Sequence, residues 1–379
     1  MPFAVTPFSP VSGEKRIVSL DGLRGCAVLL VLVHHFIALH PNLLAPLGDW
    51  RGYVRSALLL PTASGVDLFF VLSGFLVGGI LLDHQKSPDL FRSFYMRRFL
   101  RIVPLAWLFI LTMWFVGKLG WVSSPEGPVG WWPYPTFTVN FSLALNNGWW
   151  IGGLTQLWSV AIEEQFYLML PPLVRGWPTH RLFWLGPVLI AIALTSRTFV
   201  LVFFPDNLVW CHFLMPCRLD AFGLGLTAAS LVRSDRWTDW PNQRRLLWSI
   251  LALSGILFAW LVKLHAPQAA HVSWGYTVIA IFFAALLLLV QEPRETIVRR
   301  FFTAWPLLIY GRYSYFIYLF QWVAGAFLAA LLFHGTLGLW PELNWLESFV
   351  VPVLILVPAW FSWRFFEAPL LRLGKRFAY

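Results

Sequence analysis

The segment Leu20–Gly25, with the sequence Leu-Asp-Gly-Leu-Arg-Gly, opens a stretch in which the residues up to His34 are almost all Ala, Val, Leu and Ile. This pattern predicts a membrane-spanning helix with Arg24 near one end and His34 and His35 near the other. Eleven residues at about 100° each make roughly three turns, so Arg24 and His35 are expected on one face about 16 Å apart. Ionisable side chains are costly in a membrane and usually face a polar cavity. The alternative is an arginine that reaches the membrane edge and a buried, hydrogen-bonded histidine.

Composition extends this prediction to the whole chain, which is 58% hydrophobic and 12% charged. Soluble domains average about 25% charged residues. The 23 Trp and 34 Phe are typical of residues at membrane interfaces. We predict one all-α integral-membrane domain over residues 1–379, a polytopic bundle of about ten transmembrane helices. The expected spans lie near residues 23–39, 60–82, 99–118, 155–173, 183–204, 213–232, 246–264, 274–290, 307–333 and 346–363.

Most basic residues fall on one side of the expected bundle. Of 28 Lys and Arg, 20 lie in the N-terminus, residues 83–101, 174–182, 233–245 and 291–306, and the C-terminal tail, against 5 in the alternate connections. By the positive-inside rule, both termini are expected in the cytoplasm and the number of spans is even. The rule also accounts for the net charge of +10 without a nucleic-acid partner, because the basic residues form no single face or arm.

Carboxylates occur in the second and fourth expected spans, both of which enter from the outer side. Asp67 lies in the second span, and Glu163 and Glu164 lie in the fourth. Counting the rise per residue puts them at the depth of His35. Adjacent helical residues point about 100° apart, so one glutamate is expected to face the cavity, and Ser159 at i−4 favours Glu163. We predict a general-base site in which one of these carboxylates orients His35; the alternative is a buried polar network that only fixes helix register.

Two arginines lie three residues apart before the third span. Arg98 and Arg101 therefore share a face at the cytoplasmic mouth, where their planar guanidinium groups could bind the phosphates of a donor. Arg97 is expected to contact lipid headgroups, and the same contact is the alternative for Arg98 and Arg101.

Near the outer side, Trp158, Arg218 and Asp220 are candidates for binding an acceptor, although structural pairing is an equal alternative for Arg218 and Asp220. The cysteines show no metal-ligand spacing, and no set of His, Asp and Glu does so, which predicts buried thiols and no metal site.

Taken together, the motifs resemble the acyltransferase-3 family of bacterial membrane O-acyltransferases. They occur in the expected order over nearly the whole chain: Leu20–Gly25 with His35, Gly65–Phe75, Arg98–Arg101 before Ile-Val-Pro, Trp158–Tyr167, Tyr310–Phe320 and Phe366–Pro369.

The resemblance implies transfer of an acyl group, usually acetyl, from cytoplasmic acyl-coenzyme A to a hydroxyl of an envelope glycan or glycolipid. Arg24 and His35 match the family's paired arginine and essential histidine. Arg98 and Arg101 match its Arg-x-x-Arg, and residues 163 and 164 match its Glu-Glu. The family often has a histidine where this chain has Gln321, so no role is assigned to that position. Some members carry a fused extracytoplasmic hydrolase-like domain; residues 1–379 contain none, so transfer is expected either to be completed in this domain or to need a separate periplasmic partner.

Two functional hypotheses follow. The first is an O-acyltransferase of the bacterial inner membrane, with Arg24, Arg98 and Arg101 binding acyl-CoA and His35 acting as general base or transient acyl carrier. The second is a transporter of a polar or acylated solute that uses the same cavity without chemistry. Transporters of this kind typically contain inverted repeats, and we find none in the sequence.

Overall fold

The computed structural model describes residues 17–39, 54, 58–59, 61–119, 130–146, 153–234, 241–263, 268–291, 296–333 and 345–379. Within these residues the regular structure is helical, as predicted, and no strand occurs. The longer α-helices are α1 (Val18–Val33), α3 (Gly65–Asp83), α4 (Leu90–Lys118), α6 (Leu157–Gly176), α7 (Leu185–Phe203), α9 (Leu219–Leu231), α11 (Gln243–Lys263), α13 (Tyr276–Val290), α16 (Ser314–Phe333) and α17 (Trp345–Leu354).

Shorter helices connect and extend these. The short α-helices are α5 (Val139–Leu145), α8 (Trp210–Phe213), α12 (Gln268–Ala270), α14 (Ile297–Phe302), α15 (Trp305–Arg312), α18 (Leu356–Ser362) and α19 (Ala368–Gly374). The 3-10 turns are η4 (Thr179–Trp184), η5 (Pro205–Asn207) and η6 (Met215–Arg218), and the π-helical turns are η1 (His34–Ala38), η7 (His271–Gly275) and η8 (Trp363–Glu367).

Seven helical segments in the described part of the chain are long and apolar enough to cross a membrane. They are Val18–Ala38, Pro61–Asp83, Leu90–Lys118, Arg181–Phe203, Gln243–Leu261, His271–Val290 and Ser348–Gly374. A multi-pass membrane protein is therefore supported, whereas the predicted number of about ten spans and the cytoplasmic placement of the termini stay predictions.

The other three expected spans correspond to helices with different properties. α9 covers the expected span 213–232 with only 13 residues, because the preceding segment forms the 3-10 turn η6 around Pro216. α6 covers the span 155–173 but carries Glu163, Glu164 and Arg175. The span 307–333 is divided into α15 and α16, which are separated at Tyr313.

Close approach of helix backbones at glycines sets how α1 and α3 sit against their neighbours. A Cβ atom built on Gly25 would lie 2.0 Å from the carbonyl oxygen of Leu307 in α15, and one on Gly311 would lie 1.9 Å from that of Asp21. A Cβ on Gly74 of α3 would lie 2.1 Å from the carbonyl oxygen of Phe222 in α9. Membrane helices pack closely where small residues allow it. The glycines of the Leu20–Gly25 motif therefore serve helix packing as well.

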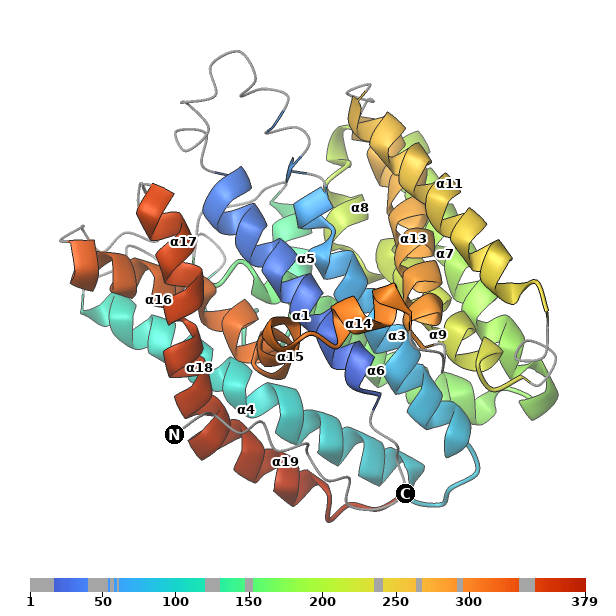
Figure 1. Ribbon diagram of the computed structural model, residues 1–379. Coiled ribbons are helices and arrows are strands. Elements are labelled where there is room, and N and C mark those ends of the chain that lie inside the picture. Colours follow the sequence, from blue (N-terminus) through green and yellow to red (C-terminus); the bar gives the residue numbers. More distant parts are fainter. Residues whose placement is uncertain are drawn as a thin grey trace.

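In Figure 1, α1 and α3 lie in the centre of the bundle, with α16 and α17 on one side and α7, α11 and α13 on the other. α19 runs along α4 at the lower edge, in agreement with the contacts between these two helices. The C-terminal residues are held against α4, where Arg97 Nε donates to the carbonyl oxygen of Phe377 at 2.7 Å and Ser93 Oγ donates to that of Ala378.

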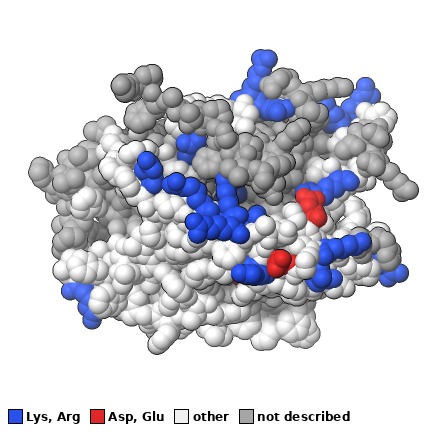
Figure 2. Space-filling model, turned by 90° about the horizontal axis from the view of Figure 1, so that it is seen from below, with Lys and Arg blue, Asp and Glu red and all other residues white. Residues whose placement is uncertain are grey.

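The end of α3, the start of α4 and α19 together form the lower face of the molecule, here called the basic face. Figure 2, which views the molecule from this side, shows many Lys and Arg side chains and few Asp and Glu. The end of α1, which η1 with His35 continues, and the start of α3 lie toward the opposite end of the bundle.

Candidate active site

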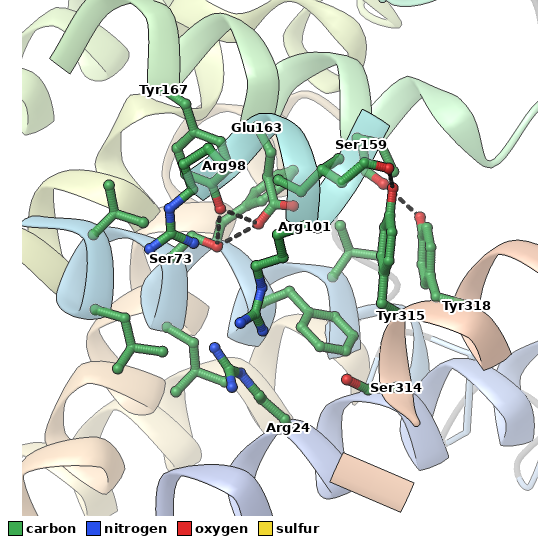
Figure 3. Close-up of a pocket in the computed structure, with 18 residues that line it drawn as sticks. Arg24, Ser73, Arg98, Arg101, Ser159, Glu163, Tyr167, Ser314, Tyr315 and Tyr318 are labelled. Atoms are coloured by element: carbon green, nitrogen blue, oxygen red, sulfur yellow. Dashed lines mark hydrogen bonds between the residues drawn. The ribbon is translucent and has the colours of Figure 1, made fainter. Parts of the chain in front are cut away.

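Three arginines from two helices converge on one space inside the basic face. Arg24 comes from the first two turns of α1, and Arg98 and Arg101 come from α4, one turn apart. Figure 3 shows their guanidinium groups pointing into the same pocket, which all three line. Arg101 is exposed there and Arg24 is half-buried, so both remain open to a ligand. Arg24 also lies 3.5 Å from the Asp21 carboxylate.

A carboxylate on α6 faces these arginines. Glu163 Oε1 accepts a hydrogen bond from Ser73 Oγ on α3 and one of 3.3 Å from the Tyr167 hydroxyl one turn along α6. Tyr167 also donates to Ser73 Oγ at 2.9 Å, and its ring lies 5.4 Å below the Arg98 guanidinium. In Figure 3 these hydrogen bonds join Ser73, Glu163 and Tyr167 next to Arg98, with Arg24 across the pocket. Glu163 is thus held in place by neighbours on two helices, while Glu164 does not line the pocket.

The arginines stand at the junction of two cavities. The smaller one, here called the inner chamber, has a volume of about 90 Å³ and is lined by Glu163, Ser159 and Tyr318 in addition to the arginines. The larger one, here called the basic cleft, has a volume of about 950 Å³ and extends to α19. Among the described residues, seven basic and three acidic side chains line the basic cleft: Arg24, Arg98, Arg101, Arg233, Arg312, Arg372, Lys375, Asp21, Asp83 and Glu367.

His35 lies beyond the inner chamber, in the π-helical turn η1 that continues α1. π-helical turns inside helices occur frequently at functional sites. The ring is half-buried, its Nδ1 lies 3.0 Å from Gln321 Oε1, and the ring centroid lies 4.7 Å from that of Trp322. Neither of the two cavities reaches His35; Tyr318 lines the chamber and Gln321, one turn further along α16, contacts the histidine.

Counting the rise per residue predicted Asp67 at the depth of His35, and the structure shows Asp67 in contact with Arg218. Asp67 accepts a hydrogen bond from Arg218, and both side chains are almost fully buried. The Tyr276 ring covers the Arg218 guanidinium at 3.8 Å, and Trp158 packs against His212 nearby. The prediction of one common depth assumed that every helix starts at the same membrane level. Glu163 bonds to Ser73, almost two turns from Asp67 along α3, so the two carboxylates lie at different levels.

Asp220 belongs to a second buried ion pair beside the first. Its Oδ2 accepts from Arg197 Nη1 at 2.9 Å and from the Thr277 hydroxyl at 2.6 Å. Arg197 also donates to the backbone carbonyls of Ser273 and Cys217, at 2.8 and 2.7 Å. Arg197 is 0% exposed and Asp220 1% exposed, so every charge of this pair is withdrawn from solvent.

Several residues of the site carried no role in the sequence analysis. Ser73, Tyr167 and Tyr318 fall inside the motifs but are ordinary helix residues by pattern, and Gln321 was set aside. The spacing of Tyr318 and Gln321 along α16 gave one signal, because it puts both on one helix face. Their partners, Ser159 and His35, lie 159 and 286 residues away, so only the fold identifies them.

The sequence motifs and this arrangement together define a membrane acyltransferase domain. A family model described as an acyltransferase domain, acyltransferase-3, matches residues 17–364. The chain therefore belongs to the acyltransferase-3 family, which confirms the resemblance found in the sequence.

Among curated relatives, the O-acetyltransferase OatA of Staphylococcus aureus strain NCTC 8325 / PS 47 is 26% identical over 396 aligned residues, covering 96% of this chain and 59% of the relative. A putative O-acetyltransferase of S. aureus strain COL is 24% identical, covering 97% of this chain and 59% of the relative. The chain thus spans less than two thirds of the length of these relatives. No solved structure matches it.

Proposed function

We propose that this chain is an O-acyltransferase of the bacterial inner membrane that moves an acyl group, in our proposal acetyl, from cytoplasmic acyl-CoA to a hydroxyl of an envelope glycan or glycolipid. The observation that carries the proposal is the position of Arg24, Arg98 and Arg101 at the junction of the basic cleft and the inner chamber. Family membership and the names of the relatives support the reaction type.

The basic cleft is the proposed donor site, and the basic face is proposed to face the cytoplasm. Its volume of about 950 Å³ lies within the range of about 300–1,000 Å³ typical of small-molecule sites. Coenzyme A carries its negative charge on phosphates, and the cleft has an excess of basic side chains. Guanidinium groups bind phosphate oxygens through paired hydrogen bonds, which favours the three arginines as phosphate or pantetheine ligands.

His35 supplies the proposed chemistry by one of two routes. In direct transfer, a ring nitrogen takes the proton of the acceptor hydroxyl while the hydroxyl oxygen attacks the thioester carbonyl. The C–S bond then breaks, and the leaving thiolate receives the proton from the ring. In two-step transfer, the ring nitrogen attacks the carbonyl and the C–S bond breaks, so that coenzyme A leaves as the thiolate. The acceptor oxygen then takes the acyl group, the bond from the carbonyl to the ring nitrogen breaks, and the hydroxyl proton ends on the thiolate. Both routes need a ring nitrogen that carries no proton.

The acyl end of the donor has to pass from the inner chamber to His35. Ser159 and Tyr318 share a 2.5 Å hydrogen bond at the chamber wall, and the Tyr318 hydroxyl also contacts the carbonyl oxygen of Gln156 at 3.2 Å. We propose that separation of Ser159 from Tyr318 opens this path. We propose that the negative charge of Glu163 offsets the repulsion between the arginines and keeps their side chains placed for the donor. Glu164 lies beside it, outside the chamber.

The buried contacts of Asp67, Arg218 and Asp220 support structural pairing, which the sequence left as an equal alternative for Arg218 and Asp220. Trp158 is 5% exposed and packs on Phe70, His212 and Phe213. An acceptor would therefore meet these groups only after a rearrangement, and we propose that it approaches His35 from the end of the bundle opposite the basic face.

The function is tested by comparing the masses of envelope glycans from cells with and without the gene. We expect the mass increments of O-acyl groups to be present only with the protein, and their size to give the length of the acyl chain. Purified protein should release coenzyme A from acetyl-CoA when the de-O-acetylated glycan is added. Transport of a solute without coenzyme A release would support the transporter hypothesis instead.

Replacing Arg98 with alanine is expected to weaken binding of acetyl-CoA about 10- to 100-fold, because a hydrogen bond to a charged group contributes about 1.5–3 kcal/mol. Arg98→Lys should recover only part of this affinity, since an ammonium group lacks the planar fork. The measurement is calorimetric titration of the purified protein with acetyl-CoA. Arg97→Ala is the matched control, because Arg97 contacts the C-terminal residues and lines neither cavity. Equal affinity in Arg98→Ala and the parent protein would contradict the donor assignment.

A further inference from the structure

Gln321 is fully buried on α16 and both ends of its side-chain amide are in contact. Its Oε1 lies 3.0 Å from Nδ1 of His35, and its Nε2 donates to the backbone carbonyl oxygen of Tyr318 at 3.0 Å. Its exposed fraction is 0%. The next residue, Trp322, packs its ring against His35. Two successive residues of α16 therefore hold one imidazole.

The contact with Tyr318 fixes which way the amide of Gln321 points. A backbone carbonyl oxygen only accepts hydrogen bonds, so the amide must present its NH₂ group to Tyr318. The amide oxygen then faces His35, and it too only accepts. His35 Nδ1 must consequently carry a proton and donate it. In a neutral imidazole this leaves Nε2 without a proton.

We propose that Gln321 is a positioning residue that holds His35 in its Nδ1-protonated tautomer, in which Nε2 carries no proton and is the reacting nitrogen. The inference rests on the proposed function and serves both routes, since a base and an acyl carrier alike need an unprotonated nitrogen with a fixed direction. A glutamine in this place is neutral. It sets the tautomer without stabilising the charged imidazolium as a carboxylate would.

Other titratable groups near His35 have to be accounted for in any test that varies pH. The His34 ring lies 5.3 Å from that of His35, and its Nδ1 is 3.1 Å from the Thr62 hydroxyl. His34→Gln is therefore measured beside the Gln321 variants.

The first test reads the tautomer directly and does not depend on activity. The full chain is labelled with ¹⁵N-histidine, and the His35 signals are identified by their absence in His35→Ala. In the parent protein we expect proton-bearing Nδ1 and proton-free Nε2 for neutral His35. A proton on Nε2 would overturn the inference and leave the proposed function standing.

The second test uses kinetics with acetyl-CoA as donor and de-O-acetylated envelope glycan as acceptor. Gln321→Leu is expected to lower kcat about tenfold, by the loss of one hydrogen bond (about 1.4 kcal/mol), with KM for acetyl-CoA unchanged because the basic cleft lies elsewhere. Gln321→Glu keeps an acceptor for Nδ1 but adds a negative charge, so kcat should be largely retained and the acidic limb of the pH–rate profile should move to higher pH. A side chain at position 321 that did not contact His35 would leave this limb in place.

Gln165→Leu is the matched control, because the Gln165 amide also bonds a backbone carbonyl, that of Phe137 at 3.1 Å, and the Asn140 side chain, and it lines neither cavity. We expect it to leave the pH–rate profile unchanged. If Gln321→Leu does not fold, the profile of Gln321→Glu decides, and an unmoved acidic limb refutes the inference. If His35→Ala is inactive while both Gln321 variants match the parent protein, only this inference fails. If His35→Ala is fully active, the proposed mechanism fails with it.

Discussion

Replacing His35 with alanine is expected to lower the rate of acyl transfer about 10³-fold, the middle of the range that a general acid–base group typically contributes. His35 is half-buried in the first half of η1, and its contacts with Gln321 and Trp322 orient its ring. Alanine retains the helix but leaves no nitrogen to take the proton or the acyl group. The measurement is the rate of coenzyme A release from acetyl-CoA in the presence of de-O-acetylated glycan.

Two further measurements separate chemistry from folding in this variant. Acetyl-CoA should bind His35→Ala with the affinity of the parent protein, because the arginines of the basic cleft are unchanged. His84→Ala is the histidine control, since His84 lies on the basic face, where it bonds the Ile80 carbonyl and stacks on Tyr379. Normal turnover in His35→Ala would remove the histidine from the mechanism.

Replacing Asp220 with alanine is expected to lower the free energy of unfolding by about 3–5 kcal/mol, because it leaves a buried charge without its partner. Arg197 would keep its bonds to the Ser273 and Cys217 carbonyls but lose the only carboxylate that bonds it among the described residues. The Thr277 hydroxyl would lose an acceptor as well. Unfolding of the purified protein in detergent, followed by loss of helical signal, measures the change.

The size of this effect depends on burial, which a second ion pair tests. Arg233 and Asp83 also form an ion pair, at the basic face, but their side chains are 35% and 50% exposed. Asp83→Ala is therefore expected to cost only about 0–1 kcal/mol. The double variant Arg197→Met/Asp220→Leu should recover much of the loss, because replacing both partners of a buried pair by apolar groups is often neutral. A loss below that of Asp83→Ala would contradict the structural role.

The same contacts show why sequence reasoning reached some residues and not others. Helix geometry relates positions within one helix, so the sequence could pair Arg98 with Arg101 and separate Glu163 from Glu164 by direction. It could not relate residues on different helices, because each helix is free to slide and rotate until packing fixes it. In this protein, the close backbone contacts at Gly25, Gly311 and Gly74 fix the positions of α1 and α3 relative to their neighbours.

Asp67 and Gln321 illustrate the consequence. A count of rise per residue put Asp67 at the depth of His35, and the structure adds that its hydrogen-bond partner is Arg218, 151 residues away. Gln321 received no role from the sequence, yet it contacts His35 across 286 residues.

The sequence by itself determined an all-helical chain with membrane-spanning segments, its acyltransferase-3 family and the residues able to carry charge or protons. These properties follow from composition, local periodicity and motifs, which need no knowledge of neighbours. Only the tertiary structure decided that Glu163 faces the arginines, that Asp67 and Asp220 pair with buried arginines and that an amide contacts the histidine. The depth and rotation of each helix depend on side chains that meet from distant parts of the chain.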